Sequence, residues 1–173
     1  TTLFRSCPGA EFGPAKRWPH YHYAELAKQL IDEGFQIVLF GSAKDHEAGN
    51  EILAALTTEQ QAWCRNLAGE TQLEQAVILI AACKAVVSND SGLMHVAAAL
   101  DRPLVALYGP SSPDFTPPLS HKARVIRLIS GYHKVRKGDA AEGYHQSLID
   151  ITPQRVLEEL NDLLLEKTEQ EEA

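Results

Sequence analysis

The chain has 173 residues, enough for one domain with a substantial hydrophobic core. Its 45% hydrophobic and 23% charged residues are ordinary for a soluble globular protein and exclude a mainly disordered or fibrous chain. The 16 basic and 23 acidic residues give a formal charge of −7 at pH 7. This sign argues against nucleic acid as the main partner, because phosphate backbones select clustered Lys and Arg.

Cysteine usage and hydropathy indicate a cytoplasmic chain without a membrane span. Cys7, Cys64 and Cys83 form no CxxC pair, so we expect reduced thiols. The longest apolar run, 76–83, is far shorter than the roughly 20 residues that cross a bilayer. The chain carries no secretory signal pattern and starts at Thr1 without a methionine, so we expect a piece of a longer protein.

In the first part of the chain, short β-branched runs alternate with helical periods. Leu3–Phe4 is expected to be the remnant of a first strand that Arg5 weakens, which leaves the first edge of the sheet poorly ordered. A helix should begin near Pro19, which suits a first turn, and end at Gly34. A buried strand is expected over 35–40 and a second helix over 45–56.

The same alternation continues to the end of the chain. Further strands are expected over 85–88, 104–108 and 125–128. Further helices are expected over 73–80, 93–100 and 152–164. We therefore expect one domain over 1–165, followed by an acidic, frayed tail over 166–173.

Alternating strands and helices with nearly all-apolar strands predict an α/β fold, a Rossmann-like doubly wound parallel sheet with helices on both faces. In such sheets ligands bind beyond the carboxyl ends of the strands. The search for chemistry therefore narrows to the loops that follow the expected strands. These loops cover 7–18, 41–45, 88–92 and 109–118.

The loop at 88–92 is the most informative of the four. A strand ends there and a helix begins, and the first amides and positive end of a helix suit a phosphate. Gly92 would let a ligand approach the backbone closely. The alternative is that Asp90 or Ser91 is simply a helix N-cap. Because Asp90 would repel a phosphate, we expect it to accept sugar hydroxyls or to brace the loop.

Three neighbouring features have both a functional and a plain structural interpretation. His95 lies four residues after Ser91 and would face the same ligand, or it is a buried structural histidine. Lys16 could neutralise a diphosphate leaving group, or it is a solvated loop lysine. The basic stretch over 121–137 is either a solvated face or a surface for an acidic acceptor.

Several stronger motifs are absent from the sequence. The patterns GxxxxGK[ST], GxGxxG and GxSxG do not occur at a strand end, which argues against a P-loop nucleotidase, a dinucleotide fold and a hydrolase elbow. No DxD-like carboxylate cluster is present. We therefore expect neither a cofactor nor a structurally required metal.

Three motifs in this order resemble the bacterial heptosyltransferases of lipopolysaccharide inner-core synthesis, glycosyltransferase family 9. They are CPGAEFGPAKRWP over 7–19, NDSGLMH over 89–95 and YGPSSP over 108–113. The resemblance runs from Cys7 to Leu165 and implies the C-terminal half of an enzyme with two Rossmann-like domains, the GT-B fold. It implies that this half binds the donor, ADP-L-glycero-D-manno-heptose.

The resemblance also implies site residues. In the family, the positions that match Lys16, Asp90, Ser91, Gly92, Leu93 and His95 meet the donor diphosphate and sugar. Looser matches place Asp45 and Thr71 at the adenosine. We further expect Gly9, Ala10, Glu11 and Gly109 to line the donor loop.

The implied reaction is a single inverting displacement, in which a hydroxyl of the first core heptose attacks while ADP leaves. Its general base lies in an N-terminal domain that this chain lacks, so we expect no catalytic residue here, weak donor binding and no turnover by the chain alone. The implied partners are ADP-heptose, the lipopolysaccharide core acceptor and that N-terminal domain. The implied location is cytoplasmic, with contact at the inner face of the inner membrane.

Two alternatives remain open from the residues. A sugar-nucleotide epimerase or hydrolase half would need its own acid and base near the diphosphate, and only His95 and Asp90 are available. A flavodoxin-like or receiver-like module would be non-catalytic. A receiver would place acidic residues at the end of its first strand, where this chain has Cys7-Pro8-Gly9.

Overall fold

A computed structural model of the chain describes residues 3–7, 13–131, 133, 135 and 137–172. Six parallel strands form one sheet in the order β3-β2-β1-β4-β5-β6. The strands are β1 (Leu3–Cys7), β2 (Gln36–Leu39), β3 (Cys64–Asn66), β4 (Ala85–Asn89), β5 (Leu104–Tyr108) and β6 (Ala123–Arg127). The order reverses between β1 and β4, so the ends of these two strands define the switch point where ligands bind in such sheets.

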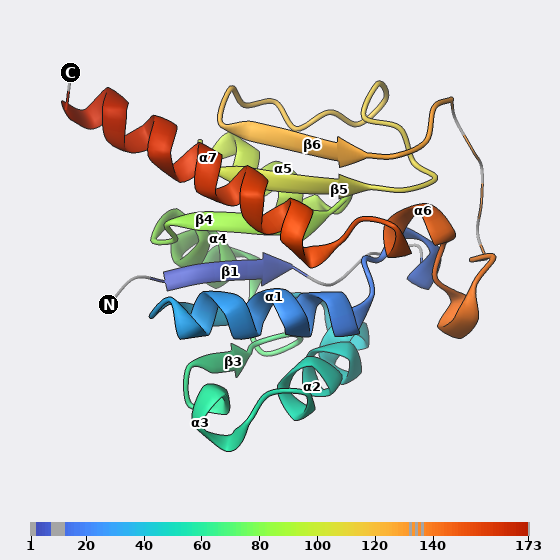
Figure 1. Cartoon of the computed structure of the whole chain (residues 1–173), viewed down its shortest axis with the longest axis horizontal. Helices are drawn as coiled ribbons and strands as arrows, with labels where there is room; N and C mark the ends of the chain where they lie inside the picture. Colours follow the sequence, from blue (N-terminus) through green and yellow to red (C-terminus); the bar gives the residue numbers. More distant parts are fainter. Residues whose placement is uncertain (1–2, 8–12, 132, 134, 136, 173) are drawn as a thin grey trace.

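Helices cover both faces of the sheet (Figure 1). The α-helices are α1 (His20–Asp32), α2 (His46–Ala54), α3 (Thr58–Gln61), α4 (Leu73–Ala81), α5 (Gly92–Ala99), α6 (Gln146–Ile149) and α7 (Pro153–Glu172). Short 3-10 helices are η1 (Pro14–Lys16), η2 (Ala43–Asp45) and η3 (Ala141–Gly143). Helices α1 and α7 pack on one face and α4 and α5 on the other, which confirms the predicted doubly wound α/β fold.

The two hydrophobic cores follow from the alternation of side chains along the central strands. All five residues of β4 and all five of β5 are buried, as expected for strands covered on both faces. Val87 and Leu107 belong to the core under α1 and α7. Val86 and Ala106 belong to the core under α4 and α5. The fold thereby holds the carboxyl ends of β1 and β4 side by side.

The expectation of a weak first edge was wrong. β1 spans Leu3–Cys7 and lies inside the sheet, where Phe4 pairs with Ile37 of β2 and with Ala85 of β4. A short segment with few apolar residues can be a central strand because both neighbours supply backbone hydrogen bonds. The sequence also missed β3 and α3, which are too short to show a period.

The last helix continues past the expected tail boundary at Glu166. α7 runs from Pro153 to Glu172, where Glu, Gln and Lys favour helix although they carry no apolar stripe. An ion pair between Arg124 and Glu166, at 2.6 Å, joins β6 to this part of the helix.

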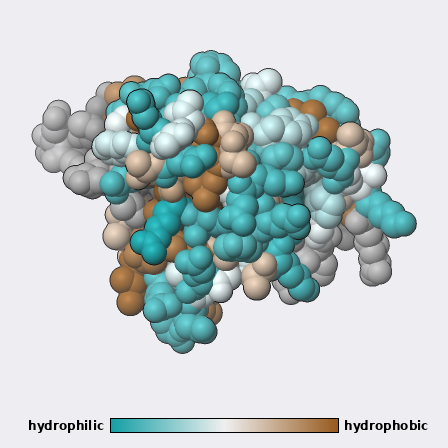
Figure 2. All heavy atoms as spheres, turned by 90° about the horizontal axis from the view of Figure 1, so that it is seen from below, coloured by the Kyte–Doolittle hydropathy of each residue, from teal (hydrophilic) through white to brown (hydrophobic). Residues whose placement is uncertain are grey.

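Viewed from below, the surface is mostly hydrophilic, and hydrophobic residues gather in a few places (Figure 2). Large exposed hydrophobic side chains include Leu73 and Ile78 of α4 and Phe115 and Leu119 after β5. None of the helices in the described part of the chain combines the length and the apolar character that crossing a bilayer requires.

Candidate functional site

The turn between β4 and α5 leaves the start of α5 uncapped by a side chain. Ser91 occupies the N-cap position with an extended backbone, φ −151° and ψ 167°, but its side chain accepts no capping hydrogen bond. Its Oγ instead lies 3.2 Å from Oγ of Ser88. The N-cap interpretation is therefore correct for the backbone position and not for the side chain. The first amides of α5 can face a ligand, with the positive end of the helix behind them.

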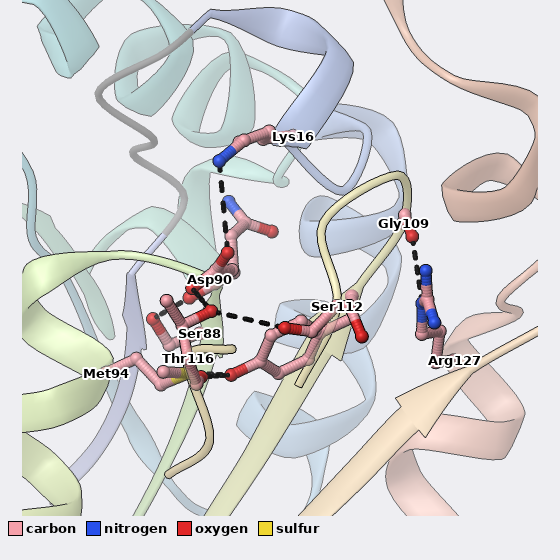
Figure 3. Close-up of polar contacts among 10 residues, drawn as sticks. Lys16, Ser88, Asp90, Met94, Gly109, Ser112, Thr116 and Arg127 are labelled. Atoms are coloured by element: carbon pink, nitrogen blue, oxygen red, sulfur yellow. Dashed lines mark hydrogen bonds and ion pairs between the residues drawn. The ribbon is translucent and has the colours of Figure 1, made fainter. Parts of the chain in front are cut away.

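Lys16 brings a positive charge to this turn. It ends η1, in the segment that connects β1 to α1, and its Nζ lies 3.9 Å from the carboxylate of Asp90 (Figure 3). The side chain of Lys16 is 24% exposed and that of Asp90 is 9% exposed. Both charges are thus shielded from much of the solvent, which strengthens their action on a nearby ligand.

A second cation is held by a buried carboxylate. Arg17 donates to Asp45 at 2.7 Å, and the other carboxylate oxygen of Asp45 accepts from the backbone N–H and the hydroxyl of Ser42, each at 2.7 Å. A Cβ on Gly41 would lie 2.6 Å from Cβ of Asp45, so only glycine allows this packing. Among the described residues, the buried Nε of Arg17 has no hydrogen-bond partner. Asp45 therefore braces the wall of the site as well as lining it.

A cavity of about 780 Å³ opens between the loop after β2 and the start of α5. Its polar lining comes from Arg17, Ser42, Lys44 and Asp45, and Gly41, Ser91 and Gly92 add backbone to it. Its apolar wall includes Phe40, Leu73, Leu93 and Val96. Apolar surface with a few convergent polar groups and cations suits a flat base joined to a charged phosphate chain.

A smaller cavity of about 390 Å³ lies on the other side of Asp90. Lys16, Asp90, Ser111, Ser112, Phe115 and Thr116 line it. The hydroxyl of Thr116 donates to Asp90 at 3.3 Å, and its carbonyl accepts the hydroxyl of Tyr108. Hydroxyls, a carboxylate and an aromatic ring around a small volume suit a sugar.

Tyr108 holds the lining loop of the smaller cavity in place. Its hydroxyl also lies 3.3 Å from Sδ of Met94, in α5. Burial, followed by the nearby charge of Asp90, raises the pKa of Tyr108 above its usual range. The phenol therefore stays protonated and remains a donor to the carbonyl of Thr116.

The structure brings most of the predicted diphosphate and sugar residues together. Ser91, Gly92, Leu93 and Asp45 line the larger cavity. Lys16 and Asp90 line the smaller cavity. The two cavities share no lining residue, but the β4–α5 turn contributes to both, through Asp90 on one side and Ser91 and Gly92 on the other.

Other predicted residues lie elsewhere or outside the described part of the chain. His95 is exposed on α5, so it is not the buried structural histidine of the alternative interpretation, and it lines neither of these two cavities; its contact with the donor stays a prediction. Thr71 also lines neither cavity, and Leu73 is the residue of this segment that does. Gly109 is buried against Leu148, and its carbonyl accepts from Arg127 at 3.2 Å. Gly9, Ala10 and Glu11 lie outside the described residues.

Sequence reasoning named Lys16 and Asp90 of the smaller cavity as site residues but missed its other side chains. Ser112 stands within the YGPSSP motif, and Phe115 and Thr116 follow this motif in the loop after β5. For Phe115 and Thr116 the signal was the position of that loop at the carboxyl end of a buried strand. No regular spacing marks them, because they come from irregular backbone.

The basic stretch is largely neutralised where the structure describes it. Lys122 pairs with Asp101 at 2.7 Å, and hydrogen bonds from Lys122 and Ser120 lower the pKa of that aspartate. Arg124 pairs with Glu166, and Arg127 donates to backbone carbonyls. These contacts favour a structural role over an acidic-acceptor surface. Within the described ranges no group of three or more His, Cys, Asp or Glu side chains is placed to hold a metal ion.

Comparison with known proteins agrees with this geometry. The family model described as "Glycosyltransferase family 9 (heptosyltransferase)" matches residues 3–145. Lipopolysaccharide heptosyltransferase 2 of Escherichia coli K12 is 93% identical over 161 residues, which is 93% of this chain and 46% of that protein. The chain thus spans about half the length of the curated relatives it matches.

Solved structures show the same fold. The structure of E. coli ADP-heptose lps heptosyltransferase II matches with a TM-score of 0.89 and 84% identity, over 99% of this chain and 48% of that one. E. coli heptosyltransferase WaaC with ADP-2-deoxy-2-fluoro heptose matches with a TM-score of 0.69 and 27% identity, over 92% of this chain and 42% of that one. These matches confirm the predicted Rossmann-like half of a GT-B glycosyltransferase. The chain belongs to glycosyltransferase family 9, the heptosyltransferases.

Proposed function

We propose that this chain is the donor-binding, C-terminal half of an enzyme that transfers L-glycero-D-manno-heptose from ADP-heptose to the first heptose of the lipopolysaccharide inner core, with inversion. The observation that carries the proposal is that consecutive residues of the β4–α5 turn line two different cavities, Asp90 the smaller and Ser91 and Gly92 the larger, with Lys16 beside Asp90. The size and lining of the larger cavity suit an adenosine. Those of the smaller cavity suit a heptose, and the diphosphate would bridge them.

The proposed binding mode uses short-range electrostatics rather than net charge. The chain carries −7 overall, and Lys16 and Arg17 each pair with a carboxylate, Asp90 and Asp45, so the positive potential at this point comes mainly from the first amides and the positive end of α5, with the two cations close by. A diphosphate there would replace water as the partner of the α5 amides. Lys16 would then stabilise the negative charge that grows on ADP as the glycosidic bond breaks.

Within this proposal the acceptor side belongs to the missing half. The general base that removes the proton of the attacking hydroxyl would come from the N-terminal domain, as would most contacts with the lipopolysaccharide core. Asp90 and Thr116 would hold donor hydroxyls and orient the anomeric carbon toward that domain. The proposal includes a cytoplasmic location with peripheral contact at the inner face of the inner membrane, where such an acceptor is found.

Ligand binding tests the proposal. A thermal-shift panel should show stabilisation by ADP and ADP-heptose, and little by UDP-sugars, NAD or FMN. Calorimetric titration of ADP-heptose into the chain, alone and with the separately made N-terminal half, should give weak binding first, then tighter binding with heptose transfer to a core acceptor. A response to FMN or NAD with none to ADP would overturn the proposal.

A further inference from the structure

The buried side chain of Asn89 joins the two walls of the proposed diphosphate site. Asn89 is the last residue of β4, directly before Asp90, and is 0% exposed. Its Oδ1 accepts the backbone N–H of Trp18 at 2.8 Å and the hydroxyl of Tyr23 at 3.0 Å. Because a backbone N–H can only donate, the atom that faces Trp18 must be the carbonyl oxygen of the amide.

The residues on the far side of these hydrogen bonds carry the cations. Trp18 follows Lys16 and Arg17 directly, so the bond from Trp18 to Asn89 lies within two residues of both positive charges. On its own side, Asn89 is followed by Asp90, Ser91 and Gly92. The bond therefore spans the switch point between β1 and β4 and ties the cationic segment to the uncapped start of α5.

The rest of the contacts make this connection stiff. The indole N–H of Trp18 donates to the carbonyl of Ile151 at 2.8 Å, and Trp18 and Tyr23 meet edge to face with ring centroids 4.8 Å apart. Trp18 and Tyr23 are 1% and 2% exposed. Because these groups are buried, losing the Asn89 acceptor leaves the N–H of Trp18 and the hydroxyl of Tyr23 without this partner, which favours a shift of the segment that carries Lys16.

We propose that Asn89 is a positioning residue, which sets the distance between Lys16 and the α5 amides and so the affinity for a diphosphate. The inference rests on the proposed function, because it assigns the gap between these walls to the donor diphosphate. It assigns Asn89 no contact with the ligand. A side chain of different length or without an acceptor at this position leaves the cations and amides present but wrongly spaced.

The test compares ADP with adenosine, because only ADP reaches the diphosphate gap. Asn89→Ala in the full chain should weaken ADP binding by about tenfold or more, since displacements near 1 Å cost this much or more in preorganised sites. Adenosine affinity should stay within about twofold. The loss should shrink at high salt, because salt screens the charges that Asn89 positions.

Two further variants separate positioning from stability. Leu104→Ala removes a side chain that is also 0% exposed, at the amino end of β5 and in the core on the other face of the sheet, so it lowers stability away from Trp18 and Tyr23, and its ratio of ADP to adenosine affinity should match that of the wild type. Tyr23→Phe deletes one donor to Asn89 and keeps the ring, and should lower ADP affinity by about threefold with adenosine unchanged. If Asn89→Ala does not fold, the ADP and adenosine affinities of Tyr23→Phe decide whether Asn89 has the positioning role.

Equal losses for ADP and adenosine in the folded variants, or unchanged ADP binding, would overturn the positioning role while the proposed function stands. A wild-type chain that binds neither ligand would instead overturn the proposed function and this inference with it.

Discussion

Gly92 gives the sharpest test of the proposal that the β4–α5 turn binds phosphate. A Cβ added to Gly92 meets nothing within 4 Å, and its backbone is not in the left-handed region, so a side chain can be introduced here without backbone strain. Because valine suits a helix slightly better than glycine, the free energy of unfolding should change by less than about 0.5 kcal/mol. The isopropyl group would occupy the mouth of the larger cavity in front of the α5 amides.

The expected loss follows from the contacts that the side chain would block. A hydrogen bond to a charged group contributes about 1.5–3 kcal/mol, so losing one between an α5 amide and the diphosphate should weaken ADP binding about 30-fold, which corresponds to about 2 kcal/mol. Gly92→Ala should lie between the wild type and Gly92→Val. Isothermal titration calorimetry with ADP measures the affinity, and circular dichroism checks the fold.

The matched control is Ala99→Val. Ala99 lies on the same helix and is exposed, away from both described cavities, so it receives the same side chain without blocking the site. Its ADP affinity should equal that of the wild type. A folded Gly92→Val protein that binds ADP as tightly as Ala99→Val would refute the close approach of the ligand to this turn.

Three further measurements probe charge and burial. Lys16→Ala should weaken ADP-heptose binding about tenfold and adenosine binding little. The control Lys28→Ala, on the exposed face of α1, should change the affinity for neither ligand. Equal losses of affinity for both ligands would show that Lys16 does not act on the diphosphate. Burial lowers the pKa of His22, whose Nε2 lies 2.8 Å from the carbonyl of Ile149. The contribution of neutral His22 to stability is therefore complete above about pH 6.5, its pKa in the unfolded chain. That contribution is lost as the pH falls toward the lower pKa of His22 in the folded chain. Urea denaturation at pH 7.5 and 5 should show this loss, and a His22→Gln protein with the same loss would contradict it. Burial raises the pKa of Cys64 to about 12, so its thiol should stay protonated and unreactive at pH 8. Peptide mapping after alkylation at pH 8 should therefore find Cys64 unlabelled in the folded chain and labelled in urea. Rapid labelling of Cys64 in the folded chain would contradict its burial.

Local patterns in the sequence were sufficient for the architecture, and they predicted the edge of the sheet at which a site would open. The apolar runs at 85–88 and 104–108 can be covered only by helices on both faces, and the confirmed parallel sheet follows from them. In such a sheet the loop at 88–92 must open at the ligand-binding edge. The Ser91 backbone conformation and the position of Gly92 on the larger cavity agree with that expectation.

Only the tertiary structure decided which side chains meet. β1 is a central strand because its neighbours β2 and β4, far along the chain, complete its hydrogen bonds. Asn89 contacts Trp18 across 71 positions, and Thr116 reaches Asp90 across 26. Helical spacing relates His95 to Ser91, but it does not say whether either side chain is covered; the packing of α5 against the sheet leaves His95 exposed. A sequence period reports which face of one element is apolar, whereas contacts between elements depend on register and loop conformation, which no local period encodes.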